Sequence, residues 1–179
     1  MFSIETESLI LRDMLEQDEG AFVAISQDDK YQRFYSEEDC APEKYIELTH
    51  LFISQAKTLP RMEYQLAIEY KESSSFIGTV CLRLEKDNQA SMGCGLAREY
   101  QGKGLIKEAV ASLAEFGFSE LNVHRIHVEI VSSNKAAIDL CKKLGMREEA
   151  LFKEHRFFKG QWWDTVVLAI LNSEWSSHA

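Results

Sequence analysis

The sequence predicts a single mixed α/β domain in which a mostly antiparallel sheet is flanked by helices. Segments of alternating apolar and polar residues are interspersed with segments of helical periodicity, in the order β α α β β β α β α β β. One helix separates two neighbouring strands, so this pair is expected to be parallel. With 179 residues, 45% of them apolar, and only two prolines, residues 1–179 are expected to form one domain with its core over 8–175.

The first part of the chain is predicted to form one strand followed by two helices. The strand is SLILRDM, residues 8–14. Asp18 can cap a short helix that ends near Gln27. Pro42 suits the first turn of a second helix, which ends before Pro60. Apolar residues recur at helical spacing along this second helix: Tyr45, Leu48, Phe52 and Ala56.

Three strands are predicted next, over residues 64–70, 76–84 and 90–96. The third strand contains Gly93 and Gly95. Glycine weakens a strand and usually marks a bulge or the close approach of another group. We therefore expect an irregularity in this strand.

The pattern then alternates between helix and strand. A helix is predicted from Gly104 to about Leu121, and a strand over 125–131. Asn134 can cap a second helix of this region, for which Gly145 is the C-terminal stop. Two final strands, 147–158 and 161–171, are joined by a tight turn at Lys159 and Gly160.

Charge and cysteine content exclude several classes of function. The net charge is −9, and residues 1–50 hold thirteen acidic residues against four basic ones, a difference of 9. Such a surface repels nucleic acids and attracts cations, although solvated acidic helix faces are an equally good explanation. Four dispersed cysteines form no C-x-x-C pair, so we expect reduced, mostly buried thiols and no metal: Cys40, Cys81, Cys94 and Cys141. The acidic N-terminus and the lack of a long apolar run predict a cytoplasmic protein without membrane contact.

The stretch EYQGKGL, residues 99–105, is the clearest candidate for a ligand site. Gly102 and Gly104 allow a tight turn, and the free amides of the helix that follows favour an anion such as phosphate. Lys103 and Lys107 can add positive charge or can be ordinary solvated residues. The loop is neither a Walker A motif nor a dinucleotide fingerprint, and a glycine pair before a helix is often simple punctuation.

The motifs around this loop resemble those of the GCN5-related N-acetyltransferase (GNAT) family. The matching segments are residues 98–104, the string SSNKAAIDLCKKLGM, residues 157–164, and the final Glu174 and Trp175. The likeness extends from Leu9 to Trp175 and is greatest to the RimJ/RimL branch. That branch includes ribosomal-protein N-terminal acetyltransferases and spermidine acetyltransferases.

The resemblance implies a fold and a cofactor. In this family the parallel strand pair is splayed and the pantetheine arm of acetyl-CoA lies in the gap, with a bulge that Gly93 and Gly95 would supply here. A plain helix cap is the alternative explanation for Asn134. The positions that would bind the cofactor are Cys94, Leu96, Gln101, Gly102, Lys103, Gly104, Leu105 and Asn134.

Catalytic residues are harder to assign, because the family transfers the acetyl group directly and needs little side-chain chemistry. Many relatives carry Glu and Tyr on the splayed strand where this chain has Ser91 and Cys94, and a tyrosine acid where it has Cys141. A water relay is equally compatible with the sequence. The candidates for a catalytic role are Glu129, His127 and Cys141, with His124, His155 and Tyr35 as further options.

The resemblance and the acidic first segment predict a cationic acceptor. It is a protein N-terminus of the ribosomal-protein type, a basic peptide or a small amine, with a polyamine such as spermidine as the alternative. Tyr35, Glu37 and Trp163 are expected to contact it. A non-catalytic acyl-CoA-binding regulatory module and a plain phosphosugar or nucleotide binder are the rival functions. A homodimer is compatible with the sequence.

Overall fold

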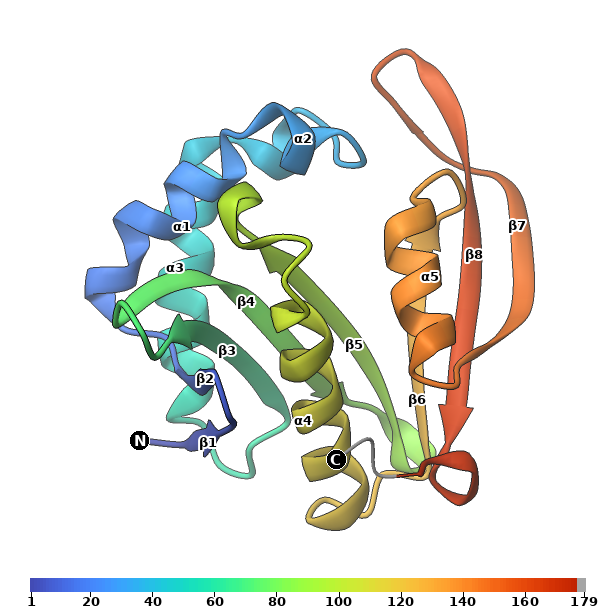
Figure 1. Cartoon of the computed structure of the whole chain (residues 1–179). Helices are drawn as coiled ribbons and strands as arrows, with labels where there is room; N and C mark the ends of the chain where they lie inside the picture. Colours follow the sequence, from blue (N-terminus) through green and yellow to red (C-terminus); the bar gives the residue numbers. More distant parts are fainter. Residues whose placement is uncertain (177–179) are drawn as a thin grey trace.

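The protein is built on one open, eight-stranded sheet, seen in a computed structural model that describes residues 1–176 (Figure 1). The strand order is β1-β2-β3-β4-β5-β6-β8-β7, and β5–β6 is the one parallel pair of this sheet. A mixed, mostly antiparallel sheet is therefore confirmed. The strands are β1 (Ser3–Glu5), β2 (Leu9–Asp13), β3 (Glu63–Tyr70), β4 (Ser75–Leu84), β5 (Gln89–Leu96), β6 (Arg125–Val131), β7 (Arg147–Phe158) and β8 (Gln161–Leu171).

Helices cover both faces of the sheet. They are α1 (Glu19–Ser26), α2 (Asp29–Gln32), α3 (Pro42–Ala56), α4 (Leu105–Ser119) and α5 (Lys135–Lys143). In Figure 1, α4 and α5 lie in front of the sheet, while α1 and α3 pack on its other side. All predicted elements are present with ends that differ by a few residues. The sequence prediction missed β1 and α2, because they are too short to show a period.

A hydrophobic core lies on each side of the sheet. The larger core joins the sheet to α4 and α5 and includes fully buried Leu66, Ile68 and Leu113. The smaller one lies under α1 and α3, where Phe22 packs edge to face on Tyr45 with ring centroids 4.6 Å apart. The two cores hold the helices in place, so the helix termini have fixed positions around the sheet.

Strands β5 and β6 pair over three residues only and then separate. The pairs are Gln89–Arg125, Ala90–Ile126 and Ser91–His127. Beyond them, β5 stays paired with β4 as far as Leu96, and β6 stays paired with β8 as far as Val131. The expected splayed pair is therefore confirmed, and Figure 1 shows the two strands diverging from a shared end.

The prediction of a bulge at Gly93 and Gly95 is wrong. The register between β4 and β5 is unbroken from Gly78–Leu96 to Leu84–Ala90. The strands diverge because β5 and β6 follow different neighbours, so no extra residue is needed. The glycines instead permit close approach, the other use of glycine in a strand: a Cβ on Gly95 would lie 2.8 Å from the Tyr31 ring.

Candidate active site

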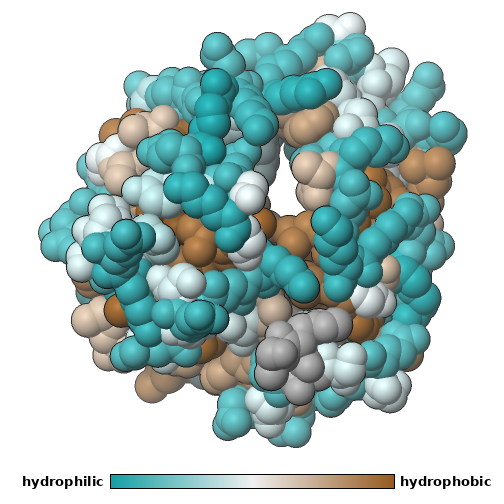
Figure 2. All heavy atoms as spheres, in the orientation of Figure 1, coloured by the Kyte–Doolittle hydropathy of each residue, from teal (hydrophilic) through white to brown (hydrophobic). Residues whose placement is uncertain are grey.

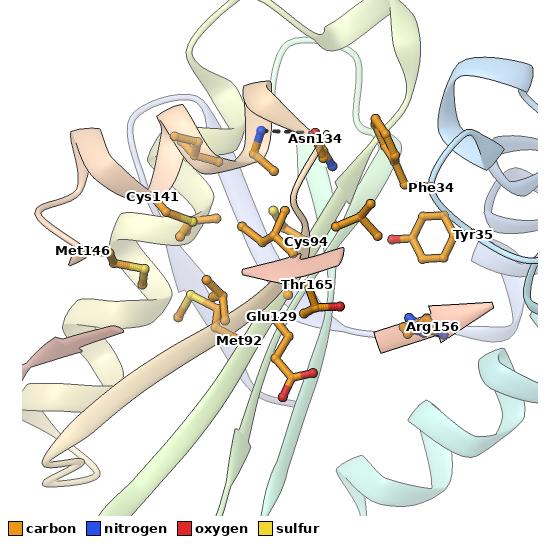
Figure 3. Close-up of a pocket in the computed structure, with 17 residues that line it drawn as sticks. Phe34, Tyr35, Met92, Cys94, Glu129, Asn134, Cys141, Met146, Arg156 and Thr165 are labelled. Carbon is orange, nitrogen blue, oxygen red and sulfur yellow. Dashed lines mark hydrogen bonds between the residues drawn. The ribbon is translucent and has the colours of Figure 1, made fainter. Parts of the chain in front are cut away.

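A pocket opens where β5 and β6 separate. Its volume is about 210 Å³, and its walls come from β5, β6, α5, the segment after α2 and the hairpin β7–β8. Seventeen residues line it (Figure 3), and most are apolar. Only Glu129 and Arg156 among them are charged. The pocket is therefore a mainly apolar space with one carboxylate and one guanidinium.

The pocket has a roof that joins the hairpin β7–β8 to the segment after α2. Lys159 Nζ donates a hydrogen bond of 2.5 Å to the carbonyl of Gln32. The rings of Phe34 and Trp163 meet edge to face with centroids 6.3 Å apart. In Figure 2 an opening passes through the molecule, with hydrophobic residues along its lower edge.

The glycine loop connects the end of β5 to α4. Gln101 is extended (φ −73°, ψ 156°), and Gly102 then turns the chain with φ 76°, a conformation that favours glycine. Gly104 is the N-cap of the fifteen-residue helix α4 with φ 81°, ψ −10°. A glycine provides no capping side chain, so the first amides of α4 are left to water or a ligand.

The loop fits a phosphate-bearing cofactor. A Cβ added to Gly102 or Gly104 would meet no atom within 4 Å, so the surface above the loop is open. The Gln101 side chain donates to the carbonyl of Leu96 at 2.9 Å and ties the loop to the end of β5. Lys103 is exposed, with Nζ 5.3 Å from the centre of the Tyr100 ring. Leu105 is buried in the larger core, which anchors the start of α4.

Asn134 caps α5, as the alternative explanation predicted. Its Oδ1 accepts a hydrogen bond of 3.3 Å from the N–H of Ala137 (Figure 3). The same side chain lines the pocket. Capping uses only the oxygen of the amide, so the NH₂ group remains a donor for a ligand.

Two cysteine thiols line the pocket from different elements, Cys94 on β5 and Cys141 on α5 (Figure 3). Burial raises the pKa of Cys141 to about 11. Cys94 is solvent-accessible but lies deep between the walls, and its desolvation, with the charges of Cys141 and Cys81, raises its pKa to about 12. Both groups are thiols, not nucleophilic thiolates, at neutral pH.

Of the catalytic candidates, Glu129, Cys141 and Tyr35 line the pocket. Within the described part of the chain, the Glu129 carboxylate has no ion-pair or hydrogen-bond partner and is exposed. His127 lies outside the pocket lining, and its Nε2 is 3.0 Å from the Glu85 carboxylate. His124 is exposed outside the lining, as is His155, whose ring packs on Phe152.

Of the three residues predicted to contact the acceptor, only Tyr35 lines the pocket. Tyr35 lines the pocket, its ring stacks on Tyr31 with centroids 5.4 Å apart, and desolvation raises its pKa above the ordinary range. Trp163 is outside the lining, meets Phe34 edge to face and stacks on Phe158. Glu37 is exposed and lies outside the lining.

Two polar lining residues, Arg156 and Thr165, were missed by the sequence analysis. Thr165 is 3% exposed, and its Oγ1 has no hydrogen-bond partner among residues 1–176. Their position in the pocket depends on the register of β7, β8 and β6, which no local pattern reveals. A polar residue inside the apolar run of β8 was the one available signal for Thr165.

Two features are absent from the described residues. No three His, Cys, Asp or Glu side chains in residues 1–176 gather in a way that could hold a metal ion. None of the helices in this range combines the length and apolar character needed to cross a membrane.

Comparison with known proteins identifies the same architecture elsewhere. Residues 8–147 match the family model "Acetyltransferase (GNAT) domain". The chain is 28% identical to an uncharacterized N-acetyltransferase, p20, of Bacillus licheniformis, over 98% of this chain and 99% of that protein. It is 31% identical to the ribosomal protein uS5-alanine N-acetyltransferase of Escherichia coli, over 48% of this chain and 44% of that protein.

A solved structure has the same fold. The spermidine N-acetyltransferase of Vibrio cholerae, in complex with CoA and spermine, superposes with a TM-score of 0.80 and 24% identity. The match covers 94% of this chain and 98% of the other. These relatives are consistent with the RimJ/RimL-type branch.

Proposed function

The chain belongs to the GNAT acetyltransferase family, and we propose that it moves the acetyl group of acetyl-CoA to the N-terminal amine of a protein or peptide. The observation that carries this proposal is the separation of β5 from β6 after three residue pairs, beside an open glycine loop. The gap leaves one backbone edge of β5 free to bind an extended ligand in the way that another strand would.

The residues that would hold the cofactor are those around this gap. The amides of residues 102–105 would bind the diphosphate, because they lead into the first turn of α4 and the N-cap Gly104 has no side chain to cover them. The Asn134 NH₂ group and the free edge of β5 from Cys94 to Leu96 would bind the pantetheine arm. When bound, acetyl-CoA supplies an activated acetyl thioester.

The chain's own contribution is to position the amine and to accept its proton. Glu129 is the single carboxylate in the pocket lining, and its unpartnered side chain can take a proton from an ammonium group directly or through water. Backbone N–H groups on the open edge of β5 can stabilise negative charge on the acyl oxygen. We propose that orientation in the apolar pocket supplies most of the rate.

A peptide N-terminus suits this pocket better than a polyamine. A polyamine carries several positive charges and needs several carboxylates, but the lining offers one carboxylate and a guanidinium. A polyamine is the second candidate, because Glu37, Glu38 and Asp39 lie in the segment that carries Phe34 and Tyr35.

The test is a thiol-release assay with acetyl-CoA and matched acceptors: a peptide with a free N-terminus, the same peptide with a blocked N-terminus, and spermidine. We expect turnover with the free peptide only and an added acetyl group in its mass spectrum. Glu129→Gln should lower kcat by about tenfold to a hundredfold, and the exposed control Glu120→Gln should not.

Each alternative predicts a different result. Binding of acetyl-CoA without turnover on any amine would support the non-catalytic module. Turnover with spermidine alone would support the polyamine acceptor. A loss of roughly a thousandfold in Glu129→Gln would contradict the view that orientation dominates.

A further inference from the structure

We propose that the acceptor carries a carboxylate close to its amine, and that Arg156 and Thr165 bind this carboxylate. The inference rests on the proposed acetyl transfer and names the acceptor class. Two sources have this chemistry: a peptide whose first residues include Asp or Glu, and a free amino acid. The acidic acceptor is indicated by Arg156 and Thr165, which have no role in the acetyl transfer itself.

Strand register places the three polar groups on one face of the sheet. Arg156 on β7 pairs with Trp163 on β8, and Thr165 is two residues further along β8. Thr165 pairs in turn with Val131 on β6, two residues after Glu129. Paired residues, and residues two apart in a strand, point to the same side. The Glu129 carboxylate on β6, the Thr165 hydroxyl on β8 and the Arg156 guanidinium on β7 thus lie on three adjacent strands, with the hydroxyl on the middle one.

Arg156 has donors to spare. Its one ion-pair partner among residues 1–176 is Asp39, with Nη2 and Oδ2 3.6 Å apart. This distance is longer than a direct charge-assisted hydrogen bond, which measures about 2.7–2.9 Å. The Arg156 side chain is 52% exposed. A ligand carboxylate can therefore take the fork of N–H groups that Asp39 leaves unused.

Thr165 provides the independent sign of a ligand. Its side chain is buried, its Oγ1 has no partner in the described chain, and in Figure 3 this oxygen points toward the side of Tyr35 and Arg156. A buried hydroxyl without a partner is unfavourable. A carboxylate held by Arg156 would supply the missing acceptor.

The charges in the pocket match this acceptor. Glu129 would face the amine and Arg156 the carboxylate, so an acceptor with both groups pairs with both charges. An acceptor that is only cationic would leave Arg156 without a ligand and would be repelled by it. The inference therefore names an acidic acceptor where the composition of residues 1–50 favours a basic one.

The decisive experiment compares matched acceptors. The first pair consists of two short peptides that differ only in having Asp or Asn as the second residue. The second pair consists of a free amino acid and its amide. We expect kcat/KM to be about tenfold or more higher for the acid of at least one pair. The pair that shows the effect identifies the source. Calorimetry of the same acceptors without acetyl-CoA gives a readout that does not depend on turnover.

Four variants separate binding from structure. Arg156→Gln should lower kcat/KM for the acid to that of the amide. Thr165→Val should raise KM for the acid about threefold to tenfold, without lowering the midpoint of unfolding, because the hydroxyl has no partner to lose. Asp39→Asn frees Arg156 and should maintain or increase the preference. The control Lys153→Gln removes a cation that pairs with Asp164 on the same hairpin and should change nothing.

Several results would overturn the inference. Equal turnover of acid and amide would do so while leaving the acetyl transfer intact. If Asp39→Asn abolishes the preference as Arg156→Gln does, Arg156 would act through its ion pair with Asp39 and would not bind the ligand. If no amine is acetylated, the proposed function fails, and calorimetry decides the inference alone. Equal affinities for the acid and its amide would overturn the acidic acceptor. Tighter binding of the acid would support it.

Discussion

The ring of Tyr31 lies so close to Gly95 that a side chain on this strand residue has no room: a Cβ there would be 2.8 Å from Cε2 of Tyr31. Tyr31 in turn stacks on Tyr35 at 12° between ring planes and shares a hydrogen bond of 3.2 Å with the hydroxyl of Tyr45. Gly95 therefore sets the position of the wall that carries Tyr35.

Gly95→Ala should disturb this wall. The added methyl displaces Tyr31 and, through the stack, Tyr35, so we expect KM for the acceptor to rise several-fold and stability to fall by about 1–3 kcal/mol. Steady-state kinetics and urea unfolding test this. The control is Gly20→Ala in α1, where a Cβ meets nothing within 4 Å and should stabilise the helix slightly. An unchanged acceptor KM would show that Tyr35 is not part of the acceptor site.

Gly104→Val should abolish cofactor binding in a protein that still folds. Gly104 has φ 81°, which a β-branched residue adopts only with strain of about 1–3 kcal/mol. A Cβ at Gly104 would meet no atom within 4 Å, so the substitution acts through backbone strain and not through a steric clash. Calorimetry with CoA measures the effect. Gly160→Val, at φ 71° and equally open in the β7–β8 turn, carries the same strain away from the loop. If both variants bind CoA like the parent protein, the loop is not the diphosphate site.

Substitutions at Asn134 can separate its two roles. Asn134→Ala should lose the cap and destabilise the protein by about 1 kcal/mol. Asn134→Ser maintains a capping oxygen but lacks the NH₂ donor, so stability should be retained while CoA affinity falls. Thermal unfolding and CoA titration are measured on both variants. Full affinity in the serine variant would leave Asn134 with capping as its only function.

The pocket thiols should react slowly. With pKa values of about 12 and about 11, Cys94 and Cys141 hold little thiolate at pH 8. We expect alkylation by iodoacetamide to be at least about a hundredfold slower than in the urea-unfolded chain. Because the folded pKa values are raised, the rate should keep increasing with pH beyond pH 9. Mass spectrometry of digests follows each site. Rapid alkylation that levels off near pH 8.5 would show that the thiols are not desolvated.

Much of the architecture can be predicted from the sequence because it depends on local interactions. The helix after Gly104 shows a clear 3.6-residue period, and Asn134 and Gly145 provide the stop signals of α5. The glycine loop was visible as a motif, since positive φ angles at Gly102 and Gly104 require this residue type. The segment α2 was missed, because one helical turn has no period to detect.

The sequence by itself thus determined the order of the longer strands and helices, the position of the glycine loop and the family. The tertiary structure decided where β5 leaves β6, that no bulge accompanies this, and that Glu129, Thr165 and Arg156 share one face. The physical reason is the range of the interactions. Periodicity and capping act within a few residues of the chain, but strand register and pocket walls join residues far apart in sequence, and their geometry depends on the packing of the whole sheet.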